Sequence, residues 1–287
     1  EGAVSFLDRI AVLHDWDPAA YRPFRIDGVR VGRVTDIGAG LLAEFPEVFQ
    51  VADDGVELHP GLGDLDARSA AVHDVIVQLA DRGDVRQPRG ETYGISEGWN
   101  APTRLRLDRG LVPMFGVKSY GVHVNGFVRG PDGLKMWIGQ RAPDKRVAPN
   151  KLDHMVAGGL AHGYSVDETV VKEAAEEADV PDALARRAKP VGALTYVTEL
   201  EQGLRDDTLF LFDLELPSDF VPRNTDGELT GFELWDIDTV MARVRDTDDF
   251  KFNVAPVLID FFVRHGLLDP DLEPDYLPIV RQLHAGR

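Results

Sequence analysis

The chain has 287 residues, enough for about two domains at roughly 100–200 residues each. Its 31 basic and 49 acidic side chains give a net charge of −18, which disfavours nucleic acid and anionic membrane surfaces as partners. It contains no cysteine, which excludes disulfides, Cys-ligated zinc, iron–sulfur clusters and thiol nucleophiles. No apolar run reaches the roughly 18 residues of a membrane span. The first five residues lack the basic region of a signal peptide, so we expect a cytoplasmic protein.

The first 112 residues are expected to form a small α+β domain. Apolar residues at helical spacing predict a short helix over 4–14. Asp27-Gly28 and Asp53-Asp54-Gly55 each lie between residues of strand character, which predicts two hairpins. A second helix is predicted over 67–82, ended by Gly83.

From residue 113 to 268 the pattern changes to strands interrupted by helices. Strands are predicted over 117–128, 135–141, 191–198, 208–216 and 231–237, and helices over 165–178, 237–244 and 254–264. Such a mixture indicates an α/β/α sandwich with a mixed sheet, so the whole chain is assigned to the α+β class. We expect residues 269–287 to form a helical C-terminal tail.

The helix predicted over 165–178 carries the most informative side chains. Ser165 and Glu168 have the spacing of a capping box, which places the helix start at Ser165. Glu173, Glu176 and Glu177 fall within an arc of about 100° on one face. These carboxylates repel one another, and a bound divalent cation removes that penalty. Oxygen ligands alone favour Mg²⁺, with Mn²⁺ as an alternative, whereas a solvated acidic face is the simpler explanation.

The glycine-rich loop before this helix completes a longer pattern. From Gly158 to Val180 the spacing resembles the Nudix (MutT-like) box, G-x5-E-x7-R-E-U-x-E-E-x-G-U. The resemblance implies the Nudix fold and metal-dependent hydrolysis of a diphosphate. It also implies metal binding by the residues that match the box at Gly158, Glu173, Glu176 and Glu177, with Glu173 and Glu177 also catalytic.

Three positions depart from the box. Tyr164 stands in place of Glu, Lys172 in place of Arg and Asp179 in place of Gly. Asp tolerates the left-handed backbone expected at a helix end. Lysine keeps the charge but loses the planar fork of arginine. The Glu-x-x-Glu-Glu core is intact, so we expect an active site and not a dead one.

The resemblance narrows to one branch of the family, the branch related to thiamine pyrophosphokinase and fused with it in fungi. It implies hydrolysis of thiamine diphosphate, or its oxo and oxy analogues, to the monophosphate. Because the chain is acidic and this ligand anionic, we expect the thiazolium cation to supply part of the attraction. The matching runs are 120–126, 137–141, 144–145, 152–159 and 172–178, with 22–32 and 250–266 towards the ends.

Five further residues are candidates outside the box. His123, Tyr120 and Asn125 are expected to contact substrate, and Arg141 could bind a phosphate in bidentate fashion. A structural histidine, a core aromatic and a surface ion pair are the respective alternatives for His123, Tyr120 and Arg141. Glu228 follows Asp226-Gly227 and resembles the late glutamate that serves as base or metal ligand in some Nudix enzymes.

Other functions stay open at this point. A pyrophosphatase of ADP-ribose or nucleoside-diphosphate derivatives is one alternative, and a degenerate Nudix module that binds a diphosphate without cleaving it is another. A Nudix isomerase of isopentenyl diphosphate usually needs a catalytic cysteine, which this chain lacks. We expect a small-molecule diphosphate as substrate and no nucleic acid or membrane partner. The oligomeric state is open, with a homodimer as one alternative.

Overall fold

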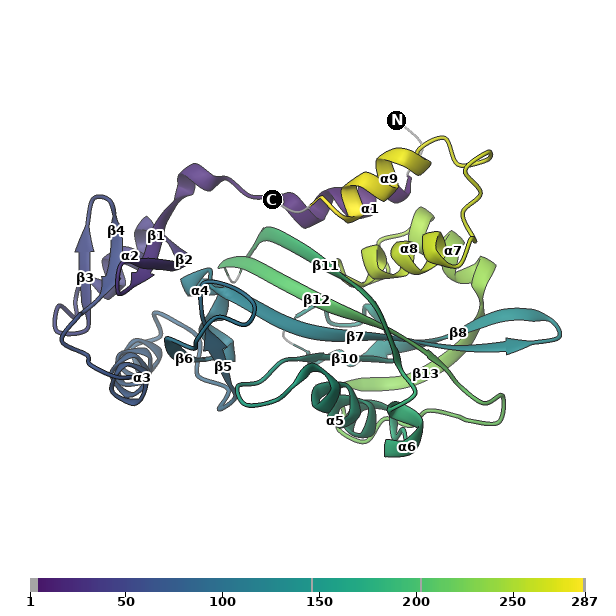
Figure 1. Cartoon of the computed structure of the whole chain (residues 1–287), viewed down its shortest axis with the longest axis horizontal. Coiled ribbons are helices and arrows are strands. Elements are labelled where there is room, and N and C mark those ends of the chain that lie inside the picture. Colours follow the sequence, from purple (N-terminus) through teal and green to yellow (C-terminus); the bar gives the residue numbers. More distant parts are fainter. Residues whose placement is uncertain (1–4, 146, 202, 286–287) are drawn as a thin grey trace.

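The computed structural model describes residues 5–145, 147–201 and 203–285. Val4, where the first predicted helix starts, and the last two residues of the predicted tail lie outside these ranges. The secondary structure is mixed α and β, as expected for the α+β class. Figure 1 shows a smaller N-terminal part beside a larger part built on one long sheet.

A four-stranded sheet and one long helix organise the N-terminal part. Both predicted hairpins are present, and Asp27 and Gly28 adopt the left-handed φ values of 52° and 74° that a two-residue turn needs. The sheet has the order β2-β1-β4-β3, from β1 (Tyr21–Ile26), β2 (Val29–Thr35), β3 (Phe49–Ala52) and β4 (Gly55–Leu58).

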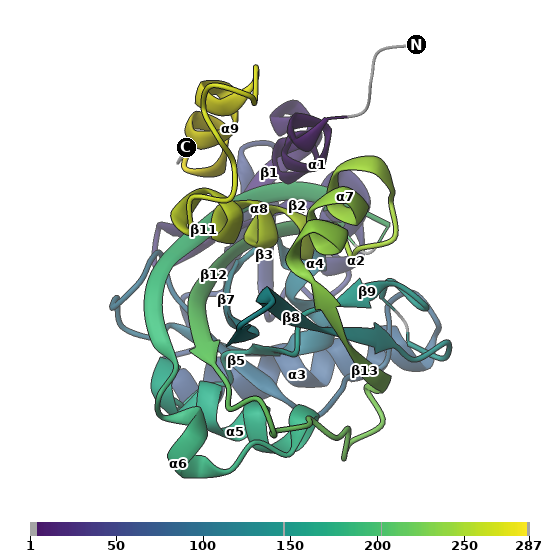
Figure 2. The same cartoon turned by 90° about the vertical axis from the view of Figure 1, so that its right-hand side faces the viewer.

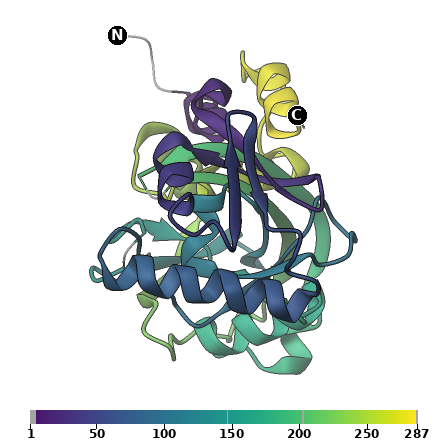
Figure 3. The ribbon, with the colours of Figure 1, turned by 90° about the vertical axis from the view of Figure 1, so that its left-hand side faces the viewer.

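The second predicted helix is α3 (Leu65–Asp81), which lies across this part in Figure 3. It buries Val72, Val75, Ile76 and Leu79, the apolar positions at helical spacing. A two-stranded sheet follows it and leads towards the larger part. The remaining elements here are η2 (Pro18–Ala20), α2 (Asp36–Leu42), β5 (Thr92–Ile95), β6 (Leu105–Asp108), η3 (Arg109–Leu111) and α4 (Val112–Phe115).

A seven-stranded mixed sheet forms the centre of the larger part. Its main order is β11-β12-β7-β8-β13, with β10 paired to β7 and β9 to β8, and the β12–β7 pair is parallel. Every strand predicted beyond residue 113 is present. The strands are β7 (Lys118–Gly130), β8 (Gly133–Arg141), β9 (Leu152–Asp153), β10 (Val156–Gly159), β11 (Lys189–Leu200), β12 (Gly203–Glu215) and β13 (Leu229–Asp236).

Helices cover both faces of this sheet, which gives the expected α/β/α sandwich (Figures 1 and 2). The predicted alternation along β7 is confirmed, because Val122 and Val124 pack in the cluster on the α5 side and Phe127 in the cluster on the α8 side. No helix in the described ranges is long and apolar enough to cross a membrane. The covering helices are α5 (Val166–Ala178), α6 (Asp182–Ala185), α7 (Ile237–Asp246) and α8 (Val254–Arg264).

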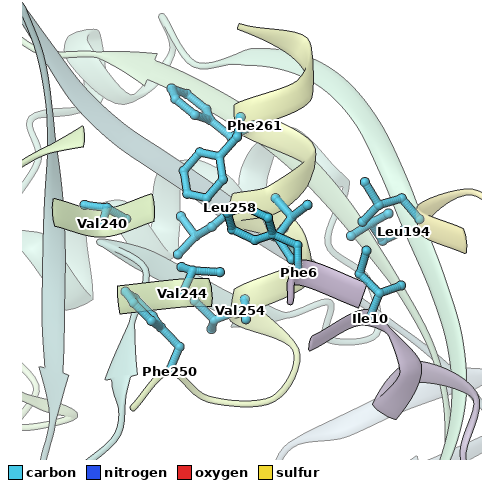
Figure 4. Close-up of a cluster of buried hydrophobic side chains, with 14 of the residues drawn as sticks. Phe6, Ile10, Leu194, Val240, Val244, Phe250, Val254, Leu258 and Phe261 are labelled. Atoms are coloured by element: carbon cyan, nitrogen blue, oxygen red, sulfur yellow. The ribbon is translucent and has the colours of Figure 1, made fainter. Parts of the chain in front are cut away.

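The first helix packs with the larger part. In α1 (Phe6–Ala11) and η1 (Val12–His14), Phe6 and Ile10 are buried against Leu194 and the residues of α8 (Figure 4). The helix α9 (Tyr276–Leu283) packs against α1 and α8, and it lies within the tail that was expected to be helical. Residues 6–14 therefore share a hydrophobic core with the sandwich. The sequence analysis places them in the N-terminal domain, residues 1–112, and these domain boundaries stay predictions.

Candidate active site

The helix α5 begins and ends as its sequence predicts. The Ser165 hydroxyl accepts from the backbone N–H of Glu168 at 3.2 Å, and the Glu168 carboxylate accepts from the N–H of Ser165 at 2.8 Å. Asp179 closes the helix in the left-handed conformation, with φ 53°. Both ends are fixed locally, so the orientation of the glutamate face is set by α5 itself.

Two of the three box glutamates point towards the glycine-rich strand β10. The buried Glu177 carboxylate accepts a hydrogen bond from the backbone N–H of Ala157 at 2.8 Å. The Glu173 carboxylate lies against Gly158, where an added Cβ would be 2.3 Å from Glu173 Cδ. Gly158 therefore leaves the space that the Glu173 side chain occupies.

The third glutamate points outwards and shares a lysine with the first. Lys172 Nζ donates to Glu173 at 2.9 Å and to Glu176 at 2.8 Å, and the Glu176 side chain is 52% exposed. Over 5–145, 147–201 and 203–285, no three His, Asp or Glu side chains converge closely enough to hold a metal ion. The Lys172 ammonium thus relieves part of the repulsion between the glutamate carboxylates, which a bound divalent cation was expected to relieve.

The electrostatics of the inner pair nevertheless suit a divalent cation. Burial raises the pKa of Glu177 well above its usual range, and the nearby carboxylates of Glu173, Asp153 and Glu228 raise it further. Burial also raises the pKa of Glu173. Among the described residues Glu177 forms no direct ion pair, although the charge of Lys251 acts on it from a distance. A buried carboxylate without a paired cation, beside a second carboxylate, is a donor set that fits Mg²⁺ or Mn²⁺.

A pocket of about 490 Å³ opens beside this face, between the N-terminal part and the sandwich. Although the chain is acidic, the described residues that line the pocket include seven basic and three acidic side chains. The basic ones are Arg86, Arg89, Arg109, Arg141, Lys145, Arg205 and Lys251, and the acidic ones are Asp144, Asp207 and Glu228. The protein itself therefore supplies positive charge for an anionic ligand, and the contribution of a ligand cation stays a prediction.

Four of the five candidates outside the box line this pocket, namely Tyr120, His123, Arg141 and Glu228. Tyr120 is half-buried and packs its ring against Trp99 and Phe210. Glu228 pairs with Lys145 at 3.1 Å. Because Tyr120 and Glu228 line the pocket, their side chains can contact a bound ligand.

Arg141 and His123 are both tied to the protein around them. The Arg141 guanidinium donates to Asp153 at 2.8 Å and to the backbone carbonyls of Val147 and Ala148. This is an ion pair, the alternative considered for Arg141, but a buried one. His123 Nδ1 lies 2.9 Å from His154 Nδ1, and burial lowers the pKa of both rings, which favours their neutral forms.

Asn125 is not brought to the pocket. Its amide donates to Asp213 at 3.0 Å, and Asp213 also accepts from Arg264 and pairs with His265, both near the end of α8. The period of two along β7 gives the face of a residue but not its distance from the ligand. Asn125 lies two residues beyond His123, where side chains from α8 occupy that face.

Several pocket residues were missed by the sequence analysis. Arg86, Arg89 and Arg109 come from the glycine- and proline-rich loop and the turn after β6, and Arg205 and Lys251 come from the sandwich. The sequence did contain one signal for a basic site, a concentration of arginines in an otherwise acidic chain. Five arginines occur from residue 86 to residue 109, at 86, 89, 104, 106 and 109.

Comparison with known proteins places the chain in a family. A family model described as a domain of unknown function (DUF4743) matches residues 6–119. Nudix hydrolase 20, chloroplastic, of Arabidopsis thaliana is 40% identical, over 91% of this chain and 72% of the relative. Nudix hydrolase 24, chloroplastic, of the same plant is 42% identical, over 92% and 73%.

Among solved structures, DR0079 of Deinococcus radiodurans is similar with a TM-score of 0.40 and 23% identity, over 61% of this chain and 94% of that one. The relationship to the two plant proteins extends over nearly the whole chain. The chain therefore belongs to the Nudix hydrolase family, the hydrolases of diphosphate bonds.

Proposed function

We propose that the protein is a Mg²⁺-dependent hydrolase of thiamine diphosphate, or its oxo and oxy analogues, that releases the monophosphate. The observation that supports hydrolysis of a small diphosphate best is the basic pocket that opens onto Gly158 and Glu228, beside the glutamate face of α5. The choice of thiamine rests on the sequence resemblance. Tyr120 and Phe252 give the pocket aromatic walls for a heteroaromatic ring.

In this proposal Glu173, Glu176 and Glu177, with the Gly158 carbonyl, would hold the metal. When bound, the metal neutralises diphosphate oxygens and lowers the pKa of a coordinated water. For Glu173 and Glu176 to turn towards the metal, the hydrogen bonds that Lys172 donates to these two carboxylates would have to break. The Ala157 N–H keeps Glu177 oriented through its 2.8 Å hydrogen bond.

A general base must accept the proton of the attacking water. Glu228 and the inner glutamates Glu173 and Glu177 are the candidates. Glu228 is more exposed than Glu177 and reaches the pocket from the loop before β13. Its ion pair with Lys145 at 3.1 Å holds the carboxylate beside the pocket.

Two observations favour alternatives. A lining rich in arginine also suits ADP-ribose or a nucleoside-diphosphate derivative, whose phosphates bring no compensating cation. The Lys172 ammonium between Glu173 and Glu176 favours a module that binds a diphosphate without cleaving it. The cytoplasmic location and the homodimer stay predictions from the sequence.

Competition kinetics test the substrate. Equimolar thiamine diphosphate, oxothiamine diphosphate and ADP-ribose are incubated with the protein and Mg²⁺, and the products are separated by chromatography. We expect the thiamine-type diphosphates to have the higher kcat/KM. Preferential cleavage of ADP-ribose would overturn the thiamine assignment and leave the family assignment intact.

A further inference from the structure

Three of the seven basic side chains in the pocket come from before the sandwich. Arg86 and Arg89 lie in the loop between α3 and β5, and Arg109 follows β6. Arg86 is half-buried and has no hydrogen-bond or ion-pair partner among the described residues. An arginine that lines a pocket without a partner has its whole planar fork of donors available for an anion.

The backbone that carries these arginines is held in place by one buried carboxylate. Asp108 accepts from the backbone N–H groups of Arg89, Gly90 and Gly110 at 2.7–3.0 Å. The N–H of Arg109 also donates to the carbonyl of Glu91 at 2.8 Å. Because the loop and the turn after β6 share this anchor, their arginines are presented from a fixed frame and little ordering is needed on binding.

The same segment packs directly on the glycine-rich loop of the Nudix box. A Cβ at Gly159 would lie 1.7 Å from the Tyr93 hydroxyl oxygen, so the tyrosine occupies the space that the glycine leaves. The N–H of His162 donates to the carbonyl of Thr92 at 2.8 Å. These contacts fix the arginine-bearing segment relative to the glutamate face.

Arg109 connects the two sides of the pocket electrostatically. It pairs with Glu91 at 2.8 Å, its side chain is 40% exposed, and it faces the ring of Tyr93. Its positive charge is felt at Glu173 and at Glu228, the two acidic groups proposed to act on the diphosphate. Arg109 is therefore placed to contact an anion held at the glutamate face.

We propose that residues 86–110 form an anion subsite in which Arg86 and Arg109 bind a phosphoryl group of the substrate. The inference rests on the proposed function in that the ligand is a diphosphate. It assigns a role to part of the segment matched by the family model of unknown function: this segment completes the binding site and selects ligands with an accessible phosphoryl group.

Binding of inorganic pyrophosphate, in buffer freed of divalent metals with a chelating resin, tests the subsite without catalysis. Isothermal titration calorimetry compares the wild type with Arg86→Gln and Arg109→Gln. Each variant should bind at least about tenfold more weakly, because charge-assisted hydrogen bonds are lost. Arg106→Gln is the matched control, since Arg106 lies on the neighbouring strand, pairs with Asp66 and does not line this pocket.

Arg86→Gln changes a side chain that has no hydrogen-bond or ion-pair partner in the part of the chain that the structure describes, so it should leave the melting temperature unchanged even if Arg109→Gln destabilises the protein. Failure of the wild type to bind pyrophosphate, or equal affinity of Arg86→Gln and wild type, would overturn the subsite. The two proposals fail separately. Cleavage of ADP-ribose in preference to thiamine diphosphate refutes the proposed substrate, while weaker pyrophosphate binding by the variants still supports the subsite.

Discussion

Gly158→Ala should remove most of the activity without unfolding the protein. The added Cβ would lie 2.3 Å from both Cγ and Cδ of Glu173 and 2.7 Å from its Oε2, against an ordinary contact of 3.4–4 Å. The overlap exceeds about 1 Å, and neither backbone can move easily, since Gly158 is paired with Val122 in the sheet and α5 is capped at both ends. The Glu173 side chain must therefore rotate out of the site.

We expect kcat/KM to fall by at least about 10²-fold, as for the loss of a metal-binding carboxylate, and the protein to lose about 1–3 kcal/mol of stability from overpacking. Phosphate release in Mg²⁺ measures the first and thermal unfolding the second. Gly130→Ala is the control, because a Cβ there meets nothing within 4 Å. Activity of Gly158→Ala within about threefold of wild type would refute the placement of Glu173 in the site.

Three further predictions concern the site and its surroundings. Glu176→Gln or Glu177→Gln should lower kcat by at least about 10²-fold at saturating Mg²⁺ with the fold intact by circular dichroism; near wild-type turnover would contradict the metal assignment. Tyr164→Glu combined with Lys172→Arg should change turnover only modestly, whereas a gain from none to measurable hydrolysis would support the binding module. Burial lowers the pKa of His154 from 6.5 to about 4, so the unfolded chain binds a proton that the folded protein excludes. The free energy of unfolding should therefore fall between about pH 6.5 and pH 4, by up to about 3 kcal/mol from this group, and His154→Gln should flatten that slope in urea titrations.

The elements that the sequence predicts well are those specified locally. Ser165, Glu168 and Asp179 fix both ends of α5 through neighbours in the chain, and the turn at Asp27-Gly28 needs only its own two residues. The elements that were missed, such as β9 (Leu152–Asp153), are short and depend on a partner strand.

The complete pocket could not be predicted, because its basic side chains come from segments that are distant in the sequence. Arg86 and Arg205 are separated by more than a hundred residues and meet only when the β5–β6 hairpin packs on the glycine-rich loop. The net charge of the chain therefore does not indicate the local charge of the site. Asn125 illustrates the converse, since a correct face on β7 still placed it against Asp213.

Phosphorus NMR of thiamine diphosphate incubated with the protein tests the central claim most directly. With Mg²⁺ we expect thiamine monophosphate and inorganic phosphate to form, with no turnover after metal removal and at most about 1% of the wild-type rate in Glu177→Gln. Bound but uncleaved thiamine diphosphate in the presence of Mg²⁺, or cleavage that persists without metal, would contradict it.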